Sequence, residues 1–242
     1  FNAYLDMIRA SAHRPNLLYT TWYDLRRKPC VDSSELGRPF CKAGRVMDER
    51  TTMDRLQLLH SELASRGVPL DGMLLEDGWD DTEEPWRAER SNFPNGIAPL
   101  GAAAAARNVS LGVWISPWGG FGESGKRRIR AGVARSFELH AGSQYTFRLG
   151  GPNYRARFRN ATLDLVGASN VSMFKVDGFG AGMGATSAGA YSEDVDRLLD
   201  LTEELRGGAA RDLWVTLSTG SWPSPFWLMS ASAVWRGGPD LG

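Results

Sequence analysis

The residues best suited to catalysis are Lys175 and Asp177, in the mostly apolar stretch Val-Ser-Met-Phe-Lys-Val-Asp-Gly-Phe-Gly at 171–180. They sit where a strand in this stretch should end. The stretch is short and ends in Gly178-Phe-Gly180, so it predicts a buried strand that opens into a loop. Side chains in a strand alternate between its faces, so Lys175 and Asp177 should point the same way. A structural ion pair is one interpretation. The other is an ionised Asp177 that acts as a nucleophile, with the Lys175 ammonium favouring its charged form.

Further candidates stand at or near the ends of other predicted strands: Trp22, Glu76, Asp77, Trp114, Arg236 and Asp240. Two carboxylates that flank a glycosidic bond are the minimum equipment for glycoside hydrolysis. Lysine and arginine can donate to sugar hydroxyls, and tryptophan can cover the apolar face of a sugar ring. Taken singly, each residue also fits a turn, a surface charge or the core. Their joint occurrence at the same ends of successive strands favours carbohydrate chemistry.

The elements that position these residues follow from hydrophobic periodicity and from turn residues. We expect strands at Leu17–Trp22, Leu70–Leu75, Leu111–Ile115, within Val171–Gly180 with its end near Asp177, at Leu213–Leu217 and at Ala233–Trp235. We expect a helix within residues 1–15, helices at Leu100–Arg107 and Tyr154–Val166, and a short one within Ser221–Ser230. A helix capped by Thr51 or Thr52 should run to about Arg66 with Met53, Leu56, Leu59 and Leu63 on one face, and a helix capped by Ser192 should run to about Arg206. Residues 121–150 are basic and irregular, and we interpret them as an insertion in the loop after the third strand.

Alternation of strand and helix demands a parallel sheet, either an open doubly wound sheet or a (β/α)8 barrel. No Gly-rich phosphate loop of the dinucleotide-binding kind follows the first strand, which weakens the open-sheet alternative. The polar residues gather at the carboxyl ends of the strands, where barrel enzymes build their active sites. We therefore expect an α/β fold, a (β/α)8 TIM barrel with about six of its eight βα units present. Residues 1–242 would form one catalytic domain that is incomplete at its C-terminal end.

Composition narrows the classes of function. The chain carries 28 basic and 28 acidic residues, so no overall field favours nucleic acid. No apolar run is long enough to span a membrane. The three histidines lack ligand spacing, so we expect neither a metal nor an organic cofactor.

Cysteine and asparagine residues bear on the cellular location of the protein. Cys30 and Cys41 lie in one polar loop, and a local disulfide and two unpaired thiols both remain open. Glycosylation sequons begin at Asn108, Asn160 and Asn170. They favour a secreted or lumenal glycoprotein.

Five motifs follow one another along the chain: Tyr19-Thr-Thr-Trp22-Tyr-Asp24, Glu76-Asp77-Gly78-Trp79, Gly112-Val-Trp114-Ile-Ser-Pro117, Lys175-Val-Asp177 and Arg236-x-x-x-Asp240. With these motifs the chain resembles the clan of retaining α-galactosidases and α-N-acetylgalactosaminidases, glycoside hydrolase families 27 and 36. It is most similar to the bacterial-type members of family 36. The resemblance covers residues 17–240, with the motifs in the family's order at strand ends.

The resemblance implies a role for each matching residue. Asp177 would be the catalytic nucleophile and Asp240 the general acid/base. Lys175 would donate to a sugar hydroxyl, and Arg236 would bind near the sugar 2-position. The acidic pair that binds the 4- and 6-hydroxyls would be Glu76 and Asp77, and the pocket would be lined by Trp22 and Trp114.

Two departures from the family pattern concern the sugar. The acidic pair is usually two aspartates, and Glu76 is one methylene longer than the residue it replaces. The family 36 loop of the Cys-Ser-Gly-Gly type is Ser218-Thr-Gly-Ser-Trp-Pro223 here. That loop shapes the 2-position, so galactose and N-acetylgalactosamine both remain open.

The resemblance therefore predicts a retaining, exo-acting α-galactosidase-like glycosidase. Its partner would be an oligosaccharide or glycoconjugate substrate, with no nucleic acid involved. A galactosyl-transferring enzyme of the raffinose-synthase kind is one alternative. A non-catalytic sugar-binding relative is another.

Overall fold

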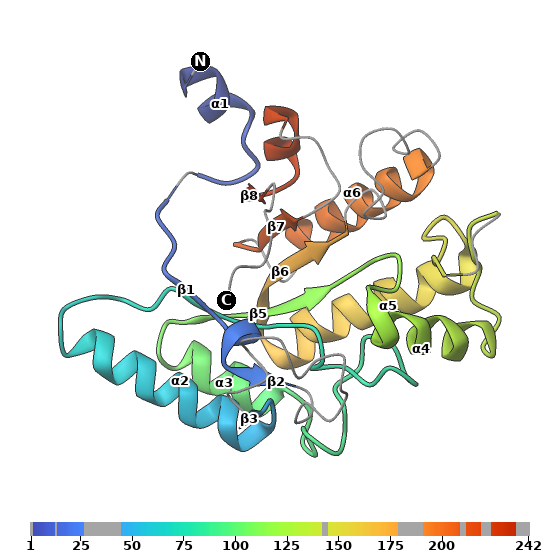
Figure 1. Cartoon of the computed structure of the whole chain (residues 1–242). Helices are drawn as coiled ribbons and strands as arrows, with labels where there is room; N and C mark the ends of the chain where they lie inside the picture. Colours follow the sequence, from blue (N-terminus) through green and yellow to red (C-terminus); the bar gives the residue numbers. More distant parts are fainter. Residues whose placement is uncertain are drawn as a thin grey trace.

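The protein is described by a computed structural model at residues 2–12, 14–26, 45–141, 145–178, 191–208, 212–218 and 224–235. Its main sheet has six parallel strands that are neighbours in the order β1-β4-β5-β6-β7-β8. The strands are β1 (Leu18–Thr20), β4 (Gly72–Leu75), β5 (Ser110–Ile115), β6 (Val171–Asp177), β7 (Trp214–Ser218) and β8 (Ala233–Trp235). The sheet curls like half a barrel (Figure 1). The predicted α/β fold with successive parallel strands is confirmed, and closure into eight strands stays a prediction.

Helices connect these strands and pack against the sheet, which Figure 1 shows for the lower and right-hand parts of the view. They are α2 (Glu49–Ala64), α3 (Ala98–Ala105), α4 (Gly122–Val133), α5 (Pro152–Ser169) and α6 (Ser192–Gly207). Helix α1 (Asn2–Ile8) precedes β1 and contacts the short 3-10 helix η4 (Pro225–Met229), and a second 3-10 helix, η1 (Thr21–Tyr23), follows β1. Buried side chains from the strands and helices share one hydrophobic core, with Phe158 of α5 and Val113 of β5 fully buried.

Several predicted details are wrong for local reasons. Residues 122–133 form α4 and are not irregular. Helix α2 is capped by Asp48, whose carboxylate accepts from Thr51 N at 2.7 Å, so neither predicted threonine is the cap. The predicted Ser192 cap of α6 is also wrong, since Ser192 is the first helical residue and Tyr191 precedes it. That residues 121–150 are an insertion stays a prediction.

A second, two-stranded parallel sheet joins β2 (Leu25–Arg26) to β3 (Arg45–Val46), and the sequence pattern did not predict it. Each strand has only two residues, which is too short for a periodicity to be visible. The expected first strand also ends early, because residues 21–23 turn into η1. Trp22 therefore stands after the strand and not within it.

The strand register places the polar candidates on one face of the sheet. Lys175 lies between Trp114 of β5 and Thr216 of β7, and Asp177 lies beside Ser218. Deeper on the same face, the Met173 side chain occupies the space beside Gly112, where a Cβ would meet it at 3.0 Å. The polar groups thus lie at the carboxyl edge, above an apolar layer.

Candidate active site

Asp177 ends β6 and is held by three donors from three segments. Its Oδ2 accepts from Trp114 Nε1 at 2.9 Å, and its Oδ1 accepts from Ser218 Oγ at 3.2 Å and from Gly178 N at 2.9 Å. These contacts fix the plane of the carboxyl group. Each oxygen can accept two hydrogen bonds, so Oδ2 keeps a lone pair beyond its bond to Trp114.

Glu76, directly after β4, forms a salt bridge with Lys175 of β6, with β5 between the two strands. Lys175 Nζ lies 2.7 Å from Glu76 Oε1, and Thr20 Oγ1 lies 3.4 Å from the same oxygen. Thr21 Oγ1 accepts from Glu76 N at 2.9 Å. The start of η1, which carries Trp22, is thereby tied to the end of β4.

The ionisation of Glu76 is shaped by burial. Only 3% of the residue is exposed. Loss of hydration raises the pKa of the Glu76 carboxyl above its ordinary value, although the Lys175 ammonium acts to lower it and the Asp177 charge acts to raise it. Since Asp177 influences Glu76 in this way, the two predicted acids belong to one electrostatic cluster.

Asp77 contacts a residue that the sequence did not single out, Arg128 of α4. Arg128 is fully buried, and its Nη2 donates to Asp77 Oδ1 and, at 2.6 Å, to Asp80 Oδ1. Its Nε donates to Asp80 Oδ2 at 2.9 Å. Burial acts to lower the pKa of the guanidinium, but Asp77 and Asp80 outweigh it and raise that pKa above its usual range.

The two tryptophans have different positions. Trp114 is 2% exposed, with the Arg128 guanidinium carbon 5.2 Å from its ring centroid. Its contribution to the site is therefore the Nε1 donor to Asp177, and not the open aromatic face that we expected. Trp22 lies in η1 and is partly exposed.

Some predicted site residues lie outside the described residues. They are Arg236, Asp240 and, from the cysteine loop, Cys30 and Cys41. Of the loop expected to shape the sugar 2-position, Ser218 is described and contacts Asp177, whereas residues 219–223 are not described. The roles of Arg236 and Asp240 stay predictions.

Two contributors were missed by sequence reasoning, Arg128 and the hydroxyl of Ser218. The segment Lys126-Arg-Arg-Ile-Arg130 belongs to residues 121–150, which we interpret from the sequence as basic and irregular, and nothing in it marks Arg128 as buried. A usable signal was on the other side of the contact. One loop carries four acidic residues, Glu76, Asp77, Asp80 and Asp81. Lys175 alone could not balance their charge, so a further buried cation could have been expected.

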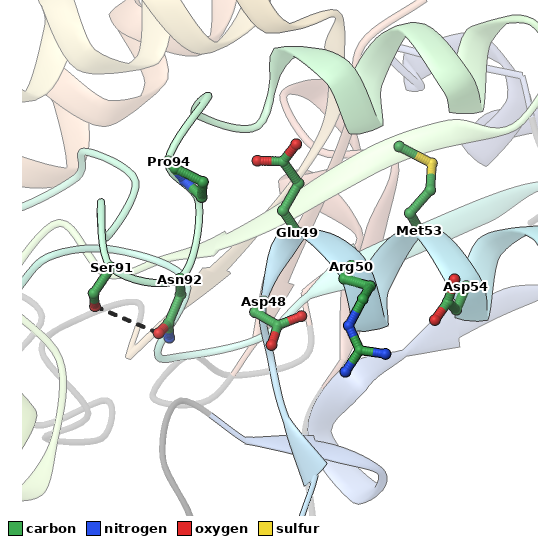
Figure 2. Close-up of a pocket in the computed structure, with 8 residues that line it drawn as sticks. All are labelled: Asp48, Glu49, Arg50, Met53, Asp54, Ser91, Asn92 and Pro94. Carbon is green, nitrogen blue, oxygen red and sulfur yellow. Dashed lines mark hydrogen bonds between the residues drawn. The ribbon is translucent and has the colours of Figure 1, made fainter.

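A groove of about 480 Å³ lies between the start of α2 and residues 91–94 (Figure 2). None of the described residues that line it belongs to the predicted site. Asp48 there caps α2, and Glu49 accepts from Asn95 Nδ2 at 3.1 Å. Asp48 and Glu49 thus have local structural partners.

Within the described residues, no group of three or more His, Cys, Asp or Glu side chains is arranged to hold a metal ion. No helix in that part of the chain is long and apolar enough to cross a membrane. The chemistry available at the cluster is that of oriented carboxylates beside a primary ammonium. Such groups can accept hydroxyl hydrogens, donate to a sugar oxygen and attack an electrophilic carbon.

Comparison with known proteins shows similarity in structure. No protein-family profile matches the chain, and no curated protein matches its sequence. An α-galactosidase of Thermus thermophilus in complex with stachyose superposes with a TM-score of 0.62 at 18% identity, over 98% of this chain and 47% of that one. A GH36 α-galactosidase of Geobacillus stearothermophilus superposes with a TM-score of 0.57 at 14% identity, over 92% of this chain and 30% of that one.

A third solved structure, α-galactosidase I of Mortierella vinacea, gives a TM-score of 0.51 at 16% identity, over 85% of this chain and 40% of that one. The chain thus spans less than half the length of these structures. At such identities the similarity establishes the fold, which is the fold of these α-galactosidases.

Proposed function

We propose that this chain belongs to a retaining α-galactosidase-like glycoside hydrolase of the (β/α)8 type, in which Asp177 is the nucleophile. The observation that carries the proposal is the setting of Asp177 at the carboxyl end of β6. Three donors orient its carboxylate, and the Glu76–Lys175 pair lies on the same face of the sheet. The likeness in fold to α-galactosidases supports it.

In the proposed first step, a lone pair of Asp177 Oδ2 attacks the anomeric carbon of a terminal α-linked sugar. The bond from that carbon to the leaving oxygen breaks, and Asp240 donates a proton to this oxygen. In the second step Asp240 accepts a proton from water. The water oxygen then displaces Asp177, and the sugar leaves with its anomeric configuration retained.

The neighbouring polar groups would hold the sugar. Lys175 Nζ can donate to a ring hydroxyl while it stays paired with Glu76, since an ammonium has three hydrogens. The free lone pairs of Glu76 and Asp77 can accept from hydroxyls. Under this proposal the terminal sugar is either galactose or N-acetylgalactosamine, and Arg236 and residues 219–223 would decide between them.

The location of the protein is part of the proposal. The three sequons support a secreted or lumenal glycoprotein. An oligosaccharide or glycoconjugate with a terminal α-linked sugar would then be its substrate. Mass spectrometry of the protein from its native source, with and without enzymatic deglycosylation, tests this.

The decisive experiment measures release of nitrophenol from α-galactoside, α-N-acetylgalactosaminide and α-glucoside substrates by the intact protein and by its Asp177→Asn variant. We expect turnover of one of the first two substrates, and a loss of at least about a thousandfold in the variant, because the amide oxygen is a poor nucleophile. Circular dichroism must show that the variant is folded. Undiminished turnover by Asp177→Asn would refute the assignment.

A further inference from the structure

Arg128 makes more contacts than an anchor for α4 requires. Arg128 forms a two-point salt bridge with Asp80, through Nε at 2.9 Å and Nη2 at 2.6 Å, and both side chains are fully buried. Its Nη1 also donates to the Gly119 carbonyl at 3.2 Å. These bonds already fix the guanidinium and neutralise its charge. The additional bond to Asp77 calls for a separate explanation.

Asp77 lies at the border between the core and the candidate site. Its side chain is 20% exposed, whereas that of Arg128 is not exposed at all. Arg128 binds Asp77 at Oδ1. Within the part of the chain that the structure describes, Asp77 Oδ2 has no hydrogen-bond donor. The carboxylate is thus held on its inner side by a rigid planar cation, and its second oxygen remains available.

Arg128 also contacts the residue that orients the nucleophile. Its guanidinium carbon lies 5.2 Å from the ring centroid of Trp114 and 5.0 Å from that of Trp86, within the range of cation–π interaction. Trp114 in turn donates to Asp177 Oδ2. One buried side chain therefore contacts both Asp77 and the indole that holds Asp177.

We propose that Arg128 is a positioning residue of the sugar site, which fixes Asp77 so that its Oδ2 accepts one particular sugar hydroxyl. This inference rests on the proposed function, and it adds a specificity determinant carried by α4. Removal of the planar fork lets the Asp77 carboxylate rotate. The site then loses its preference for sugars that carry that hydroxyl, while general binding and folding are retained.

The test measures binding of galactose, 4-deoxygalactose and 6-deoxygalactose by calorimetry, in the parent and in Arg128→Lys. Lysine keeps the charge and loses the fork. The parent should bind galactose about tenfold to a hundredfold more tightly than one of the deoxy sugars, the factor that a hydrogen bond to a charged group provides. In Arg128→Lys that ratio should fall toward one, with KM for an α-galactoside raised more than kcat is lowered.

The matched control is Arg159→Met, which removes an arginine of α5 from an exposed salt bridge with Glu204 and should leave the ratio unchanged. Where Arg128→Lys does not fold, Asp77→Asn serves, because the bonds between Arg128 and Asp80 remain. It should also lose the preference. Retention of the parent's ratio for both deoxy sugars, in whichever of the two variants folds, overturns the inference.

The two proposals fail in different ways. A parent protein that binds galactose with the expected preference but hydrolyses no α-glycoside overturns the proposed function alone. A parent that hydrolyses an α-galactoside without any preference between galactose and the deoxy sugars overturns the role of Arg128 alone. A parent that neither binds galactose nor hydrolyses an α-glycoside overturns both.

Discussion

Lys175→Met removes the cation that partners the buried Glu76 carboxylate, and it should destabilise the protein in a pH-dependent way. Glu76 is 3% exposed, and its salt bridge with Lys175 measures 2.7 Å. Methionine has a similar length and cannot donate a hydrogen bond. Glu76 must then either carry an uncompensated charge in a buried position or take up a proton.

Breaking a buried pair by removing one partner typically costs about 3–5 kcal/mol. Lys175 is itself partly exposed, so we take the lower end, about 3 kcal/mol, as the expected loss at pH 8. For a chain of this size each kcal/mol lowers the melting temperature by about 2–4 °C, so a drop of about 6–12 °C is expected. The folded state as a whole is stable by only about 5–15 kcal/mol.

The pH dependence has a definite sign. Without Lys175, the pKa of the folded Glu76 carboxyl rises further above its ordinary value of 4.5. Such a group contributes stability that is fully present below the unfolded value and is lost as the pH rises through the folded pKa. The difference between Lys175→Met and the parent should therefore grow from pH 5 to pH 8, by at most about 1.4 kcal/mol for each pH unit crossed.

Urea unfolding followed by tryptophan fluorescence at pH 5, 6.5 and 8 measures this difference. The matched control is Arg66→Met, which breaks an exposed salt bridge to Glu62 and should cost less than about 1 kcal/mol at every pH. The double variant Lys175→Met/Glu76→Gln should recover most of the stability at pH 8. A loss that is the same at pH 5 and pH 8, or a double variant that recovers nothing, would show that this account of the pair is wrong.

Three further changes test single features. Asp48→Ala should lower the free energy of unfolding in urea by about 0.5–2 kcal/mol, because α2 loses its cap, whereas Asp48→Asn should retain most of it. Gly101→Ala should lower the melting temperature and loosen α3 against α5, since its Cβ would lie 1.9 Å from the Ser169 carbonyl oxygen; an unchanged melting temperature would contradict that packing. Glu76→Gln alone should remove the decline in stability that the raised Glu76 pKa imposes as pH increases, seen as a flatter pH profile of urea midpoints.

The elements with strong local patterns could be predicted from the sequence. The stretches Val171–Asp177 and Ala233–Trp235 are strands at the expected residues. Helix α2 buries Leu56, as its apolar spacing predicted. The strand Val171–Asp177 and helix α2 could be predicted because their apolar patterns are long, and because Gly178 and Gly67 follow them.

The remaining features depend on contacts between distant parts of the chain. Strands of two residues, such as Leu25–Arg26, exist only because a partner strand lies beside them. Arg128 is buried because Asp77 and Asp80 stand opposite it, and in sequence it looks like its exposed neighbour Lys126. The Lys175 pairing with Glu76 likewise comes from the curl of the sheet, which brings β6 within reach of β4 across β5.

The order of the strands has a consequence for how the chain acquires its structure during synthesis. In the main sheet, each strand after β1 pairs with a strand that leaves the ribosome before it. The sheet can therefore grow in one direction, because the neighbour on which each new strand pairs has already been synthesised. Asp177 emerges with Trp114 already in place, but its bond to Ser218 forms only when β7 arrives. The hydrogen-bonded setting of Asp177 is thus completed late, after most of the sheet beneath it has formed.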